Sequence, residues 1–125
     1  MASDPDKRIP TEIKLHQQSR ILAITFNDGA QFRLSCEFLR VHSPSADVKR
    51  HGVGDGVLQV GKEAVNITAV EPVGNYAVKL LFDDGHSTGL YSWDYLYDLA
   101  VNQDRYWMDY LDALKAAGYQ RKPVA

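Results

Sequence analysis

The sequence predicts an α+β fold with two antiparallel three-stranded β-meander units, each followed by a short helix, and a further C-terminal helix. Two observations lead to this prediction. The pattern FNDG at 26–29 returns as FDDG at 82–85, and Asp-Gly between β-like segments is a strong hairpin signal. Each pattern is followed by a returning strand and a short segment with helical spacing, in which Leu39 corresponds to Leu96.

The first unit begins with residues 12–18, where apolar and polar side chains alternate as in a half-buried strand. Residues 21–26 are rich in β-branched and aromatic side chains, and the Asn-Asp-Gly turn leads from them to a partner strand at 31–35. We expect a type I′ turn, with positive φ at both central residues. Residues 36–42 have helical spacing before Pro44 and predict a short helix.

The second unit follows a polar, glycine-rich segment at 45–56, which we expect to be a loop. Strands are predicted at 57–61, 65–74 and 75–82, with a return strand at 86–92. In the segment 75–82, four side chains fall on one face at period two: Tyr76, Val78, Leu80 and Phe82.

Two helices complete the prediction. Ser92 is placed to cap a helix at 93–101, because its side chain can accept a hydrogen bond from a free N–H of the first turn. Asp104 is predicted to cap the last helix, at 105–117, and Gly118 to end it. That helix carries an apolar stripe formed by Trp107, Tyr110, Leu111 and Leu114.

Length and composition limit the class of protein. The chain has 125 residues, 45% hydrophobic and 24% charged, as in a globular domain. We expect a disordered tail at 1–10 and a single domain at 11–120. The net charge of −2 does not favour nucleic-acid binding, and no apolar run reaches the ~18 residues of a membrane span or forms a signal-peptide core. The single cysteine, Cys36, excludes an internal disulfide. A cytoplasmic protein with neither nucleic-acid nor membrane partners is expected.

The most specific motif begins at Asp84 and reads DGHSTGLYSWDYL. Together with FNDG and the upstream FLRVHSPSADV, it resembles the N-terminal domain of gamma-butyrobetaine hydroxylase. More closely, it resembles the small stand-alone bacterial proteins that share this domain, the DUF971 family. The resemblance runs from about Ile13 to Leu99 and implies a domain without catalytic activity. The iron- and 2-oxoglutarate-dependent chemistry of the hydroxylases lies in a separate C-terminal barrel, which we expect this chain to lack. None of the four histidines begins the His-x-Asp part of that metal triad. We therefore expect no enzyme activity.

The resemblance also implies a structural zinc site in the hydroxylases, made by three cysteines after a Leu-Arg pair and by the histidine of the Asp-Gly-His turn. In this chain the three cysteine positions hold Ser43, Ser45 and Val48, and only His86 matches the fourth ligand. Neutral hydroxyls are poor zinc ligands, so zinc is not expected. The domain is also similar to one appended to P-loop iron–sulfur carrier proteins, an analogy that points towards iron.

His86 is the sharpest candidate for a metal ligand or a polar binding residue. With Asp84, and with His42 or Cys36 nearby, it would supply donor types that suit iron. The alternative is structural: Asp84 and Gly85 turn the chain, and His86 hydrogen-bonds a neighbouring loop.

Two further groups of residues each allow a functional and a structural interpretation. Tyr91 and Tyr95 are candidates for an exposed binding rim, whereas the helical spacing of the other aromatic residues nearby predicts core packing. The segment around Arg40, His42 and Ser43 either forms a small polar pocket or simply ends the helix. If the hydroxylase arrangement holds, this segment meets the Asp-Gly-His turn in space.

Three hypotheses follow. The leading one is a non-catalytic binding or adaptor domain that contacts a protein partner or a small ligand. Its binding surface would comprise Arg40, His42, Asp84, His86, Tyr91 and Tyr95. The alternative is a metal-binding accessory protein that handles iron or iron–sulfur clusters, with His86 as the anchor. The third is a structural relic, in which hydrogen bonds fill a former zinc site.

Overall fold

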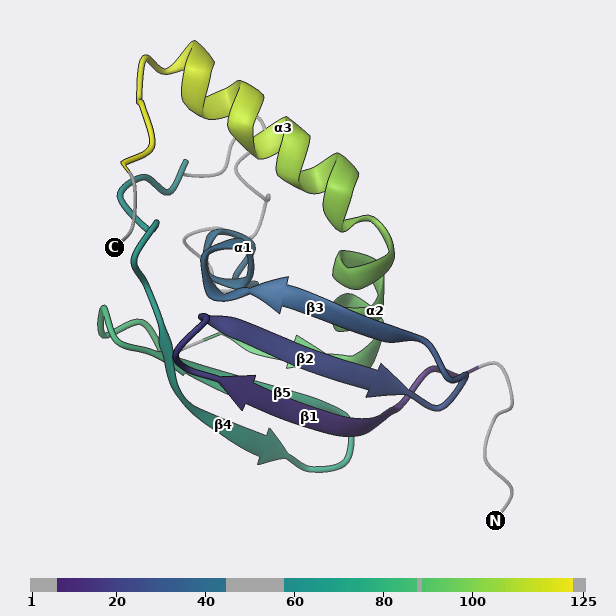
Figure 1. Cartoon of the computed structure of the whole chain (residues 1–125). Helices are drawn as coiled ribbons and strands as arrows, with labels where there is room; N and C mark the ends of the chain where they lie inside the picture. The colour runs from purple at the N-terminus through teal and green to yellow at the C-terminus, as the bar shows by residue number, and fades with distance from the viewer. Residues whose placement is uncertain (1–6, 45–57, 88, 123–125) are drawn as a thin grey trace.

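The computed structural model describes residues 7–44, 58–87 and 89–122. Within these ranges the chain forms six strands and three helices (Figure 1). In order they are β1 (Pro10–His16), β2 (Ile21–Phe26), β3 (Gln31–Ser35), α1 (Cys36–Val41), β4 (Ile67–Val73), β5 (Ala77–Phe82), β6 (Leu90–Ser92), α2 (Trp93–Val101) and α3 (Gln103–Ala116). No helix in the described ranges is long and apolar enough to cross a membrane.

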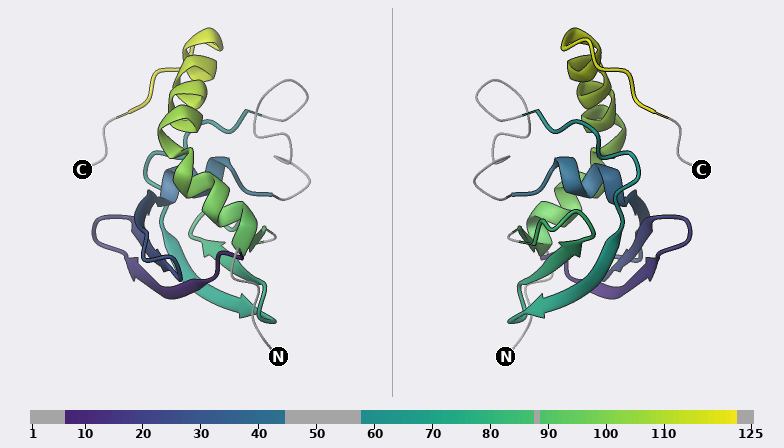
Figure 2. Two further views of the ribbon diagram at one scale, coloured as in Figure 1. Left: turned by 90° about the vertical axis from the view of Figure 1, so that its right-hand side faces the viewer. Right: turned by 90° about the vertical axis from the view of Figure 1, so that its left-hand side faces the viewer.

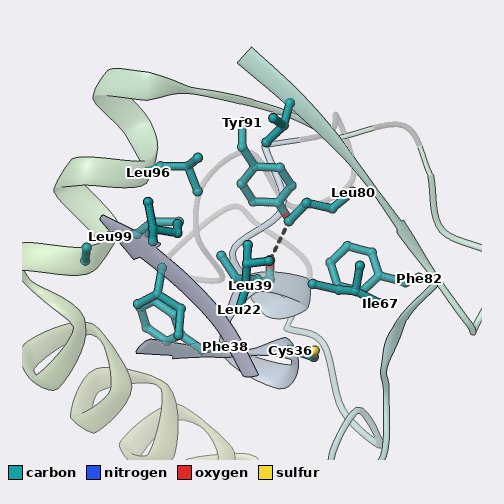
Figure 3. Close-up of a cluster of buried hydrophobic side chains, with 14 of the residues drawn as sticks. Leu22, Cys36, Phe38, Leu39, Ile67, Leu80, Phe82, Tyr91, Leu96 and Leu99 are labelled. Carbon is teal, nitrogen blue, oxygen red and sulfur yellow. Dashed lines mark hydrogen bonds between the residues drawn. The ribbon is translucent and has the colours of Figure 1, made fainter. Parts of the chain in front are cut away.

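The strands form two antiparallel sheets, in the orders β1-β2-β3 and β4-β5-β6. Each sheet is followed by a helix, and α3 completes the chain, which confirms the predicted α+β fold with two meander units. Inward side chains of both sheets and of α1 and α2 belong to one buried cluster (Figure 3). The core therefore lies between the two units rather than within either of them.

Period-two burial explains how each sheet faces that core. In β2, Leu22, Ile24 and Phe26 are buried, whereas the residues between them are half-buried. In β5 the predicted face is correct for Val78 and the two alternate residues after it, but Tyr76 precedes the strand and is 52% exposed.

The two Asp-Gly turns have the same geometry, but it is not the predicted one. A type I′ turn requires positive φ at two residues, and here only the glycine has it, with φ of 86° at Gly29 and 89° at Gly85. The Gly29 N–H donates to the Phe26 carbonyl at 3.0 Å, and Gly85 donates to Phe82 at 3.2 Å. Each is a three-residue loop ending in a glycine bulge, and the sequence repeat is therefore also a structural repeat.

Helix α1 is short and buried along its whole length. It begins where the Ser35 side chain accepts a hydrogen bond from the Phe38 N–H at 3.0 Å. Its residues join the core on one side, and on the other side Val41 packs against Tyr110 and Leu114 of α3. The helix thus lies between the sheets and α3 (Figures 1 and 2).

Helices α2 and α3 meet at Asn102. Ser92 caps α2 as predicted, accepting a hydrogen bond from the Tyr95 N–H at 3.2 Å. The predicted Asp104 cap of α3 is wrong, because the helix already begins at Gln103. Asn102 occupies the cap position without a capping bond, since its side-chain amide instead donates to the carbonyl and the carboxylate of Asp98.

The end of α3 agrees with the prediction. Gly118 has φ of 77° and donates to the Lys115 carbonyl, while the Tyr119 N–H donates to the Leu114 carbonyl at 2.9 Å. These two bonds define a Schellman motif, which requires a residue in the left-handed region. Of the predicted stripe, Tyr110 and Leu114 are buried, and the other two residues are half-buried.

The chain after α3 folds back over the molecule. Arg121 forms an ion pair with the buried carboxylate of Glu37 in α1. The Tyr119 hydroxyl donates to Glu63 at 2.7 Å, and the Lys122 N–H donates to the same carboxylate. The last described residues are thereby attached to α1 and to the segment before β4.

Four other predicted segments differ from the structure or lie outside the described ranges. Residues 58–61 form no strand, and β6 covers only Leu90–Ser92 of the predicted 86–92. Pro10, within the predicted tail, already pairs with Phe26, while residues 1–6 lie outside the described ranges. The predicted loop at 45–56 also lies outside them.

The cap of α2 gives a first test. We expect Ser92→Ala to lower the free energy of unfolding by about 1 kcal/mol, because the Tyr95 N–H loses its acceptor. Ser92→Thr keeps the hydroxyl and should lose clearly less. Urea unfolding followed by circular dichroism measures both. Equal losses in the two variants would contradict the capping role.

Candidate functional site

The end of α1 meets the turn between β5 and β6. The Ser43 hydroxyl lies 2.8 Å from Nε2 of His86, and Nε of Arg40 donates to Oδ2 of Asp84 at 2.8 Å. These four residues are called the polar cluster below. The expected meeting of the helix end with the Asp-Gly-His turn is therefore present, across more than forty residues of sequence.

Asp84 is the electrostatic centre of the polar cluster. Its Oδ2 accepts from both Arg40 and Lys62 at 2.8 Å, and its Oδ1 accepts from the His86 backbone N–H at 3.1 Å. Burial opposes ionisation, but the hydrogen bonds from Lys62, His86 and Arg40 outweigh it and lower the pKa of Asp84 to about 2. Asp84 is thus a carboxylate held between two cations.

Tyr91 and Tyr95 satisfy carbonyl groups at the end of α1. The Tyr91 hydroxyl donates to the Leu39 carbonyl at 2.6 Å (Figure 3), and the Tyr95 hydroxyl donates to the His42 carbonyl at 2.5 Å. A helix leaves its last carbonyls without intrahelical partners, so these two hydroxyl groups supply donors that the helix itself lacks. The predicted exposed rim is wrong for Tyr91, which is 0% exposed, while Tyr95 is half-buried. Burial raises the pKa of both phenols.

His42 lies on the side of α1 that faces α3. Its Nδ1 donates to the Phe38 carbonyl at 2.9 Å, and its ring packs against Phe38, Tyr106 and Tyr110. It is buried among these aromatic rings. His42 therefore serves the packing of α1 on α3.

The other predicted metal-site residues are distributed as follows. Cys36 is buried at the opposite end of α1, 3.7 Å from Oδ1 of Asn66, as expected for a small core residue. Burial raises the pKa of its thiol. Ser45 and Val48 lie outside the described residues. In the part of the chain that the structure describes, no three His, Cys, Asp or Glu side chains come together as a metal site would require.

The polar cluster can hold the fold together more readily than it can perform chemistry. The Ser43–His86 distance is that of a nucleophile and its base, but Ser43 is 0% exposed and offers no surface to a substrate. What the four side chains do achieve is to tie the end of α1 to the β5–β6 turn.

Two contributors were missed by sequence reasoning. Lys62, from the segment before β4, supplies the second cation on Asp84. Gly89 lies so close to Ser43 that a Cβ there would be 2.3 Å from the serine Oγ and 3.2 Å from Pro44. The glycine of the Asp-Gly-His-x-x-Gly motif was the available signal, and its physical reason is this close approach.

The Gly89 contact predicts a coupling between two positions. Gly89→Ala should lower the free energy of unfolding by about 1–3 kcal/mol, because the added methyl group overlaps Ser43 Oγ. In a Ser43→Ala background that atom is gone, so the cost of Gly89→Ala should fall by at least about 0.5 kcal/mol. A double-mutant cycle by urea unfolding measures the coupling. Strictly additive losses would show that overlap with Ser43 Oγ is not the cause of the cost of Gly89→Ala.

Asp84 predicts an acid-sensitive part of the stability. Its native pKa of about 2 lies below the ordinary value of 3.8, so the native state binds fewer protons than the unfolded state between these values. The stabilisation is present above about pH 4 and is lost as the pH falls towards about 2. Because the side chain is 22% exposed, we expect a contribution of only about 1 kcal/mol.

Between about pH 2 and pH 4, the free energy of unfolding should change less with pH for Asp84→Asn than for the native chain. Asp104→Asn, on the exposed face of α3, is the matched control and should keep the native slope. An unchanged slope in Asp84→Asn would exclude this carboxylate as the source.

Comparison with known proteins is consistent with this geometry. The family model described as gamma-butyrobetaine hydroxylase-like, N-terminal, matches residues 13–97. Two similar structures were solved by NMR in solution. One is 56% identical with a TM-score of 0.80, covering 100% of this chain and 93% of the other. The second is 51% identical with a TM-score of 0.79, covering 94% and 93%.

A third similar structure is a crystal structure of a protein of unknown function from Acidithiobacillus ferrooxidans, assigned to the DUF971 family. It is 41% identical with a TM-score of 0.60, and the match covers 73% of this chain and 91% of that one. Among curated proteins there is no match. The family model spans more than half of the sequence, and the chain thus belongs to the gamma-butyrobetaine hydroxylase-like N-terminal (DUF971) family.

Proposed function

We propose that this chain is a non-catalytic binding module, in which the polar cluster stabilises the fold and the exposed faces contact a partner. The observation that carries the proposal is that the four side chains of the cluster bond to one another in two pairs, while Nη1 of Arg40 is buried without a hydrogen-bond partner among the described residues. Arg40 is 7% exposed and bonded to Asp84, and Ser43 is fully buried and bonded to His86. Side chains that are engaged with one another in this way support a structural role.

The residues at the implied zinc position do not fit that ion. Ser43 places a neutral hydroxyl where the resemblance implies a cysteine thiolate, and a hydroxyl is a weak zinc donor. Asp84, on the same turn as His86, already has Arg40 and Lys62 at 2.8 Å. Two cations at that distance oppose the approach of a third positive charge.

The same electrostatic argument weighs against an iron-handling role. That role stays the alternative because His86 and Asp84, two possible iron ligands, lie on one turn.

Under the proposed function, His86→Ala should fold and lose about 1–3 kcal/mol of unfolding free energy, since Ser43 loses a buried partner. Purified protein, prepared without chelator or histidine tag, should contain no stoichiometric metal. Titration with Fe(II) or Zn(II) should shift no amide signals around the Asp-Gly-His turn.

His16→Ala is the matched control, because His16 is an exposed imidazole on β1 that reports adventitious metal contact. Stoichiometric iron that disappears in His86→Ala but persists in His16→Ala would replace the binding module with the iron-handling role. Elemental analysis and amide NMR give this answer on the intact chain.

A further inference from the structure

The first sheet carries a hollow of about 480 Å³ on its outer face, the side away from the core. The strand register explains its shape. Ala23 of the central strand is paired with Lys14 of β1 and with Arg33 of β3, and paired side chains point to the same side of a sheet. A methyl group therefore forms the floor, and two long cationic side chains form the walls.

Polar groups extend this hollow along the strands. Thr25, the next outward residue of β2, pairs with Gln31, and Glu12 lies opposite it on β1. His16 lines the other end. From Glu12 to His16 the strand advances ~13 Å, about the length of four residues of an extended peptide.

The centre of the hollow is positively charged. Among the ion pairs between residues that the structure describes, none includes Arg33. Nζ of Lys14 lies 3.5 Å from Oε2 of Glu12, but these side chains are 61% and 55% exposed, so their attraction is weak. The Lys14–Arg33 pair thus presents two cations across Ala23, while the Glu12 end is negative.

We propose that this face binds an extended acidic segment of a partner protein, with a carboxylate held between Lys14 and Arg33 above Ala23. The inference deepens the proposed binding function and rests on it. Arginine binds carboxylates with two parallel hydrogen bonds, and lysine adds a second charge. Glu12 repels an acid at its own end, so the preferred segment places a neutral polar residue there, within reach of Thr25 and Gln31.

The probe for this proposal is a short blocked peptide of alternating Glu and Ser residues, titrated into isotope-labelled protein. We expect amide shifts centred on Ala23 and its paired residues in β1 and β3. Lys14→Glu/Arg33→Glu should weaken binding roughly tenfold or more, because both attractive charges become repulsive. Added salt should weaken it too, since the charges are exposed.

Arg105→Glu/Lys115→Glu on α3 is the matched control, because it changes the net charge equally on another surface and should retain binding. A blocked peptide of alternating Gln and Ser residues has no carboxylates and should bind more weakly than the Glu-Ser peptide. Absent shifts, shifts that map elsewhere, or equal weakening by the two double variants would overturn this assignment. Those results would contradict the peptide site but not the proposed binding module. Iron that binds stoichiometrically and depends on His86 would contradict the binding module, whether or not the peptide binds.

Discussion

Helix α1 is the element on which the rest of the structure depends. A helix of six residues is not stable by itself, and all six residues of this one are buried. Its last carbonyls must therefore find donors inside the protein. Tyr91 supplies one and Tyr95 another, so the positions of β6 and α2 are fixed by the end of a helix that precedes them by fifty residues.

The two units of the repeat hold each other in a reciprocal way. Asp28, in the turn of the first unit, accepts from the hydroxyl of Tyr97 in α2 at 2.8 Å. Asp84, at the same place in the second turn, accepts from Arg40 in α1. Each turn thus contacts the helix of the other unit. Since the core is also shared, neither unit has a complete set of partners without the other.

Features that depend on near neighbours were predictable from the sequence. The strands at 21–26 and 31–35 and the Ser92 cap follow from side-chain alternation and from a single hydroxyl. The buried position of Tyr91 was not predictable in this way, because its hydroxyl donates to a carbonyl that lies fifty-two residues away in the sequence. The meeting of the helix end with the Asp-Gly-His turn followed from the family resemblance, but local signals gave no indication of Lys62, whose charge acts only after folding.

The return of the chain after α3 has a consequence for the order of folding. Glu37 is buried in α1, and its counter-ion Arg121 follows it by 84 residues in the sequence. A buried carboxylate without a partner is costly, so α1 reaches its final environment only when the C-terminal segment is available. During synthesis, α1 is therefore fully stabilised only after Arg121 has emerged.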